Sequence, residues 1–135
     1  MKKNVLVDLS ASIIHHGHIR ILKKASNIGN VIVALTSDDE IRKKKGYKPE
    51  LSYENRKEII KSIKYVKKVI KSKWLIDENF LKKYKISYLV HGSDNSNKIK
   101  KEKLIIFPRT KGISSSLIRR KSRKILEQNE KRIKT

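Results

Sequence analysis

The chain of 135 residues contains no cysteine. Without thiols, neither disulfide bonds nor a zinc-thiolate site can hold the fold together, which fits a reducing compartment. Long apolar runs are also missing near the start, where the run Val5 to Val7 ends at Asp8. This run is too short for the core of a signal peptide or for a membrane span. We therefore expect a cytoplasmic protein without membrane insertion, whose length suits a single domain covering residues 1–135.

Acidic and aromatic residues are both scarce. There are 13 Asp and Glu against 35 Lys and Arg, which gives a formal net charge of +22, and aromatic side chains make up 6% of the chain. Such a charge attracts polyanions, including nucleic acids, anionic lipids and nucleotide phosphates. Proteins that bind single strands usually place aromatic side chains along a basic groove, whereas here lysines are spread along the chain. The composition thus favours solvated basic faces over a nucleic-acid-binding surface.

Short apolar runs alternate with longer amphipathic segments, a pattern typical of βαβ units and a parallel sheet. The predicted strands are 4–8, 30–35, 66–70, 87–92 and 103–108, and the predicted helices are 17–29, 52–64, 77–85 and 114–134. Residues 37–51 carry glycine, proline and a run of charges, and we expect them to form a mobile polar loop. The predicted fold is a Rossmann-like α/β domain with a parallel sheet of about five strands and helices on both faces. Ligands then bind beyond the carboxyl ends of the strands.

Three histidines, His15, His16 and His18, lie in the turn between the first predicted strand and the first helix. The start of a helix presents unpaired N–H groups and a positive dipole end, which suit a phosphate. Gly17 lets the backbone approach a ligand, and two imidazoles can stabilise charge that develops at an attacked phosphorus. A metal site is disfavoured because no carboxylate lies near His15 and His18 in the sequence. The other alternative is that the histidines are ordinary turn residues.

A second phosphate-binding element is predicted after the fifth strand, in the sequence FPRTKGISSSLIRR. Arg109 precedes a glycine and a run of serines that begins the terminal helix, so backbone amides and hydroxyls gather at another helix start. An ordinary capped helix would also show serines here. Two such elements at the same edge of one sheet are much harder to explain by chance.

The motifs His-x-Gly-His, SYENRK and RTKGISSS together resemble the nucleotidyltransferases of the HxGH type, and most closely the small cytidylyltransferases. The resemblance runs from about residue 3 to residue 120. It implies transfer of CMP from CTP to a small phosphorylated alcohol, with release of pyrophosphate and with Mg²⁺ escorting the nucleotide. It also implies a homodimer. No residue of the chain is assigned as a metal ligand.

The resemblance also implies roles for individual residues. His15 and His18 stabilise the transition state, Lys45 reaches substrate and nucleotide phosphates, and Arg109 completes the catalytic set. The implied nucleotide-binding residues are Leu9, Ser10, Gly17, Arg56, Lys64, Asp94, Thr110, Gly112, Ile113, Ser114 and Ser115. Arg56 and Lys64 could instead be solvated charges, an interpretation that we favour for Lys64.

Several positions depart from the family pattern. The usual phosphate turn Gly-Thr-Phe-Asp is replaced by residues 9–12, Leu-Ser-Ala-Ser, which looks like a variant found in cytidylyltransferase domains associated with phosphonate biosynthesis. A second basic position after Lys45 is Tyr47, and a lysine that holds glycerol phosphate is replaced around Asp77. Glycerol 3-phosphate leads as the acceptor, with 2-hydroxyethylphosphonate as the main rival. Two other hypotheses remain. The enzyme uses ATP in place of CTP, or the chain is a nucleic-acid-binding protein with a degenerate nucleotide site.

Overall fold

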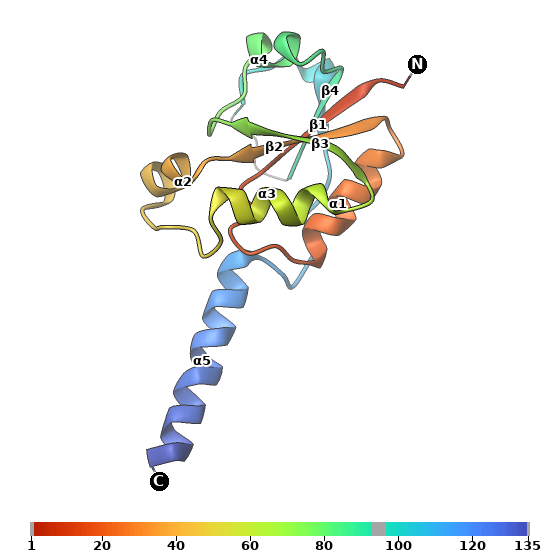
Figure 1. Cartoon of the computed structure of the whole chain (residues 1–135). Helices are drawn as coiled ribbons and strands as arrows, with labels where there is room; N and C mark the ends of the chain where they lie inside the picture. The colour runs from red at the N-terminus through yellow and green to blue at the C-terminus, as the bar shows by residue number, and fades with distance from the viewer. Residues whose placement is uncertain (1, 93–96, 135) are drawn as a thin grey trace.

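The fold is a five-stranded sheet, all parallel, in the order β3-β2-β1-β4-β5 (Figure 1). The computed structural model describes residues 2–92 and 97–134. The strands are β1 (Asn4–Leu9), β2 (Asn30–Thr36), β3 (Val66–Ser72), β4 (Tyr88–His91) and β5 (Leu104–Ile106). The helices are α1 (His16–Ser26), α2 (Asp38–Lys45), α3 (Tyr53–Lys61), α4 (Glu78–Lys83) and α5 (Ser115–Lys134), with a short 3₁₀ turn at Lys101–Lys103. The predicted Rossmann-like fold class is confirmed.

Two apolar cores lie on opposite faces of the sheet, because side chains alternate along each strand. On one face, Val5 and Val7 of β1 pack with Leu22 of α1 and Ile60 of α3. On the other, Leu6 packs in a second cluster with residues such as Leu81 of α4. Burial on both faces explains why the central strands read as continuous apolar runs in the sequence.

Side-chain caps set where most helices begin. The Ser52 hydroxyl accepts a hydrogen bond from the Asn55 N–H at the start of α3, as the sequence predicts, and Asp77 caps α4 in the same way. Such caps satisfy N–H groups that have no partner inside the helix. α3 ends at Lys61, three residues before the predicted end.

The segment 37–51 is not the continuous loop that its composition predicts, because residues Asp38–Lys45 form the helix α2. Ser37 accepts a hydrogen bond from the Glu40 N–H, and the helix stops at Gly46 in the left-handed conformation. Acidic residues fill the first turn and basic residues the last, an arrangement that the helix dipole stabilises. The charge run that suggested mobility thus stabilises a short helix.

The helix α5 projects away from the sheet (Figure 1). Most of its described side chains beyond the first turn are exposed, and Ile133 near its end retains 85% of its accessible surface. No helix among residues 2–92 and 97–134 is both long and apolar enough to cross a membrane. Because the rest of α5 is exposed, only its start contributes to the region at the carboxyl ends of the strands.

Candidate active site

A cleft of about 460 Å³ lies at the carboxyl ends of the strands. It forms where the sheet order reverses, since β2 and β3 lie on one side of β1 and β4 and β5 on the other. Eleven of the predicted site residues line it: Leu9, Ser10, His15, Gly17, His18, Lys45, Arg109, Thr110, Ile113, Ser114 and Ser115. The structure therefore brings together residues from distant parts of the chain around one cavity.

The two histidines at the start of α1 hold each other in place. His15 is the N-cap, and its Nδ1 accepts a hydrogen bond from the Gly17 N–H at 3.1 Å. The Nδ1 of His18 accepts from the His15 N–H, also at 3.1 Å, and the ring centroids lie 4.0 Å apart. A neutral imidazole that accepts at Nδ1 carries its proton at Nε2. Both rings thus have an N–H group that can donate to a ligand.

Burial keeps these two rings neutral. Burial and the neighbouring charge of His15 lower the pKa of His18 from 6.5 to about 4, and burial together with His16 lowers the pKa of His15. Neutral N–H donors that are already positioned can stabilise negative charge at a phosphoryl group without reorganisation during the reaction.

Gly17 is required by the close approach of two side chains. A Cβ atom at this position would lie 2.8 Å from Cε1 of His15 and 3.4 Å from Cγ2 of Ile113. The first distance is too short for a real contact, so any larger residue would push the His15 ring. The absence of a side chain here sets the position of a ring that lines the cleft.

The start of α5 is tied to the loop that precedes α1. The Ser115 hydroxyl donates to the Ile13 carbonyl at 3.0 Å and accepts from the Ile13 N–H at 3.2 Å. The Ser114 hydroxyl accepts from the Leu117 N–H at 3.1 Å and caps the first turn of α5. The two phosphate-binding elements predicted from the sequence are thereby fixed to one another.

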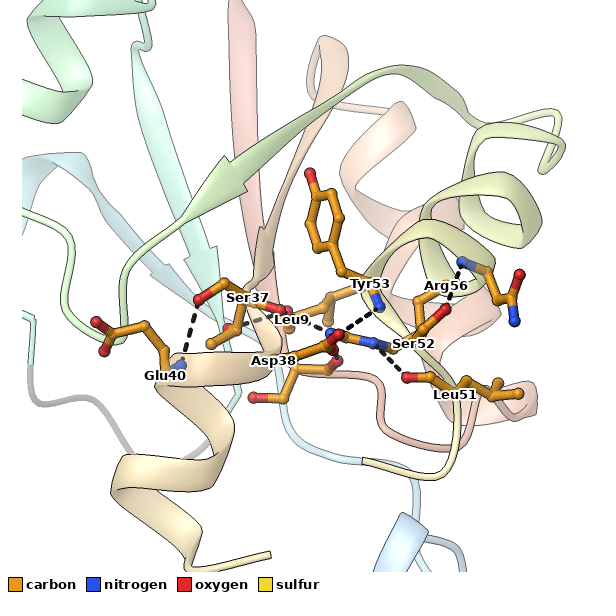
Figure 2. A network of polar contacts seen from close by, with 11 residues as sticks. Leu9, Ser37, Asp38, Glu40, Leu51, Ser52, Tyr53 and Arg56 are labelled. Carbon is orange, nitrogen blue, oxygen red and sulfur yellow. Dashed lines mark hydrogen bonds and ion pairs between the residues drawn. The ribbon is translucent and has the colours of Figure 1, made fainter. Parts of the chain in front are cut away.

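Arg56 lies outside the cleft lining and is fully buried. Figure 2 shows its contacts with Leu51 and Asp38. Its guanidinium donates to the carbonyl oxygens of Ser10 at 2.7 Å, Thr36 at 2.8 Å and Leu51 at 3.0 Å. It also donates to a carboxylate oxygen of Asp38 at 2.6 Å. The side chain is therefore not the solvated charge considered from the sequence. It joins the loops after β1 and β2.

Three further predicted residues are not placed in the cleft lining. Lys64 lies before β3 with its Nζ over the ring of Tyr65, 5.2 Å from the centroid, and it does not line the cleft. Gly112 has a φ of +78°, which favours glycine in the turn before α5. Asp94 lies outside the described residues.

Sequence reasoning missed a carboxylate and a histidine at the ends of two central strands. Asp8 and His91 line the cleft, and their Oδ1 and Nδ1 atoms lie 2.6 Å apart. Asn97 donates to the other oxygen of Asp8 at 3.4 Å and accepts from the Ile76 N–H at 2.7 Å. The positions of Asp8 and His91 at the carboxyl ends of β1 and β4 are a signal that could have identified them.

The cleft is strongly basic. Among the described residues that line it, Asp8 is the one carboxylate, whereas the cations are Arg20, Lys24, Lys45 and Arg109. No group of three or more potential metal ligands exists among residues 2–92 and 97–134. A cavity of this kind suits two phosphate-bearing substrates.

Comparison with known proteins agrees with this arrangement. Residues 10–121 match the family described as cytidylyltransferase-like. Glycerol-3-phosphate cytidylyltransferase of Bacillus subtilis is 34% identical over 122 residues, which cover 87% of this chain and 95% of that protein. The FAD synthase of Thermococcus kodakarensis is 33% identical over 123 residues, which cover 87% of this chain and 79% of that protein.

A solved structure shares the fold. The lipopolysaccharide core biosynthesis protein from Thermoplasma volcanium superposes with a TM-score of 0.67 at 20% identity, covering 84% of this chain and all of that one. The family match spans both segments that the sequence predicts to bind phosphate, together with strands β2 to β5. The chain belongs to the cytidylyltransferase-like family and is a nucleotidyltransferase.

Proposed function

We propose that the enzyme transfers CMP from CTP to a small phosphorylated alcohol, with glycerol 3-phosphate as the leading acceptor, and releases pyrophosphate. The observation that carries this proposal is the pair of imidazoles of His15 and His18, which accept hydrogen bonds at Nδ1 and line a cleft that also holds Arg109. The resemblance to glycerol-3-phosphate cytidylyltransferases supports the choice of CTP and acceptor.

In this reaction an oxygen of the acceptor attacks the α-phosphorus of CTP, and the bond to the pyrophosphate oxygen breaks. No covalent intermediate with the protein is needed, so the protein acts by positioning and by stabilising charge. His15 and His18 donate to the equatorial oxygens of the α-phosphate, and Arg109 neutralises the triphosphate. The N-terminal ends of α1 and α5 add positive dipole ends at the same cleft.

Mg²⁺ fits this site as a companion of the nucleotide. Because the described cleft residues include one carboxylate, already bonded to His91, the ion would be held by phosphate oxygens and water. Bound in this way, Mg²⁺ would neutralise part of the charge of the triphosphate.

Two observations favour alternatives within the same class. The Leu-Ser-Ala-Ser turn at residues 9–12 favours a phosphonate acceptor such as 2-hydroxyethylphosphonate. The similarity to FAD synthases favours ATP as an alternative nucleotide.

For the nucleic-acid hypothesis, duplex DNA binding should fall steeply with salt because counterions are released. CTP binding that survives moderate salt while duplex binding vanishes would count against that hypothesis.

Pyrophosphate release tests the proposal directly, with Mg²⁺ and either CTP or ATP against glycerol 3-phosphate, 2-hydroxyethylphosphonate, phosphocholine and phosphoethanolamine. We expect turnover with CTP and glycerol 3-phosphate. His18→Ala should lower kcat by about 100-fold or more, the range for removal of one positioned donor. His16→Ala is the matched control, since His16 does not line the cleft. Equal turnover in both variants would overturn the role of His18.

A further inference from the structure

The helix α5 is attached to the body of the protein by its start and then runs away from it (Figure 1). The Ser115 hydroxyl donates to the Ile13 carbonyl at 3.0 Å. Two turns of chain later begins the free part of the helix, after Arg119 has donated to Glu50 at 2.7 Å. From residue 120 to residue 133 every side chain is exposed. The anchored start therefore holds out a helix whose remaining turns face solvent on all sides.

Four apolar side chains lie along one side of this helix. Ile118 and Ile125 are seven residues apart, and so are Leu126 and Ile133, which is close to two helical turns. At about 100° per residue, the four lie within an arc of about 100°, which we call the apolar stripe. Ile125 keeps 47% of its accessible surface and Leu126 keeps 62%. The stripe thus has the width of a buried helix face, yet it is exposed to water.

The rest of the helix surface is strongly basic. Residues 119–133 contain seven Lys and Arg residues against two Glu. At the same angular spacing, Lys121 and Arg132 fall beside one edge of the apolar stripe and Arg123 falls beyond the other edge, whereas Glu127 falls on the opposite side. Long basic side chains therefore flank the exposed apolar surface.

This combination selects a partner that is apolar and anionic at once. A second copy of α5 would bring its own basic residues against these, and like charges in an interface are costly. A nucleic acid would match the charge, but its phosphate backbone would leave Ile125 and Leu126 in water. A bilayer with anionic lipids offers acyl chains to the stripe and phosphates at the level of the flanking cations. The lipid surface is the partner that satisfies both halves of the helix.

We propose that α5 docks the protein onto the surface of a bilayer that contains anionic lipids. The helix lies in the plane of the interface, with the apolar stripe against the acyl chains and Lys121 and Arg123 on headgroup phosphates. It is about 30 Å long, from its 20 residues, but it is not apolar enough to cross a membrane. Ser122 and Asn129 fall within the arc of the stripe, so the docking is reversible and depends on the anionic lipid. This inference goes beyond the proposed reaction and does not depend on it.

Flotation with lipid vesicles tests the docking on the full chain. One set of vesicles contains phosphatidylcholine alone, and the other contains phosphatidylcholine mixed with phosphatidylglycerol. Basic residues near an anionic surface strengthen binding by about fivefold each. We expect the partition coefficient to be at least tenfold higher for the vesicles with phosphatidylglycerol, and to fall as salt is added.

The apolar contact is tested by Leu126→Ser, with Leu117→Ser as the matched control. Both leucines are exposed residues of α5, and they lie nine residues apart, on opposite sides of the helix. Burial of a leucine side chain contributes substantially to binding, so Leu126→Ser should lower the partition coefficient at least fivefold. Leu117→Ser should change it by less than twofold.

The charge contact is tested by the double variant Lys121→Gln/Arg123→Gln. Its matched control is Lys67→Gln/Lys68→Gln, which removes the same charge from two exposed positions of β3. We expect at least a tenfold loss of binding in the α5 variant and less than a threefold loss in the β3 variant. Thermal unfolding should be unchanged in all these variants, because the substituted side chains are exposed.

Equal binding to both kinds of vesicle, or binding to neither, would overturn the proposal. Equal losses in each variant and its control would show a general attraction of a basic protein to anionic lipid, and would also refute it. A dimer in size-exclusion chromatography that Leu126→Ser dissociates, with vesicle binding unchanged, would assign the apolar stripe to a second copy instead. Pyrophosphate release by the wild-type protein tests the proposed function separately, because flotation needs no turnover.

Discussion

Replacing Arg56 should have a large effect on stability, although the residue lies outside the cleft lining. Its guanidinium is fully buried and donates to three carbonyl oxygens and to Asp38. Arg56→Met keeps much of the side-chain volume but leaves those acceptors without their donors. Asp38 keeps 43% of its side chain exposed, so water can replace the guanidinium there, and the loss comes mainly from the three carbonyl oxygens. Each buried carbonyl that stays unpaired costs about 1–3 kcal/mol. We therefore expect the free energy of unfolding to fall by at least about 3 kcal/mol.

Urea unfolding followed by Trp74 fluorescence and by far-UV circular dichroism measures this loss. The loss is a large part of the roughly 5–15 kcal/mol that stabilises a typical domain. Arg42→Met is the matched control, because Arg42 pairs with Asp39 while both side chains are largely exposed, at 66% and 74%. Exposed pairs of this kind contribute about 1 kcal/mol or less.

The reasoning is refuted if Arg56→Met and Arg42→Met lose the same stability. Arg56→Lys is a further comparison, since an ammonium group cannot reach all four acceptors at once with the geometry of a guanidinium. We expect its stability to lie between those of the wild type and Arg56→Met.

The other predictions concern the residues at the start of α1. The pKa of His18 is about 4 in the folded protein and 6.5 in the unfolded chain. The unfolded chain therefore binds a proton at His18 more readily, and the free energy of unfolding falls as the pH drops from 6.5 toward 4. The slope is at most roughly 1.4 kcal/mol per pH unit. Urea unfolding at pH 7 and pH 4.5 should show a smaller drop in His18→Asn than in the wild type, and equal drops would contradict the prediction. Gly17→Ala should fold but lose tenfold or more in kcat, because the new Cβ displaces the His15 ring. A wild-type kcat in a folded Gly17→Ala protein would show that the ring position does not matter.

Much of the fold could be predicted because hydrophobic burial sets it locally. Residues Val31 to Leu35 are all buried, and their continuous apolar run predicts a central strand. α2 could not be predicted in this way because Ile41 is its one buried residue, so almost no apolar periodicity marks it. The capping residues Ser37 and Gly46, and the order of acidic residues in the first turn and basic residues in the last, specify this helix instead. β3 extends to Ser72 because its last residues pair with Leu35 and Thr36, which no local pattern could reveal.

The cleft residues at the starts of α1 and α5 could be located from the sequence because glycine, histidine and serine have specific uses at helix starts. The environment of Arg56 was not, since its acceptors lie 5, 18, 20 and 46 residues away in the chain. An arginine on a predicted helix gives no sign of which distant carbonyl groups it meets. The same holds for Tyr47, whose ring stacks against Arg119 of α5, 72 positions further along the chain.

The bond between Ser115 and Ile13 has a consequence for the order of events during synthesis. The two residues are 102 positions apart, and the cleft lining includes residues 109–110 and 113–116. A chain emerging from the ribosome therefore has its sheet-forming residues available before the residues that complete the cavity. Contacts at such long separation form late, since loop closure must occur first. A nascent chain that has not yet reached the first turn of α5 contains all five strands but lacks the serines that line the cleft from α5.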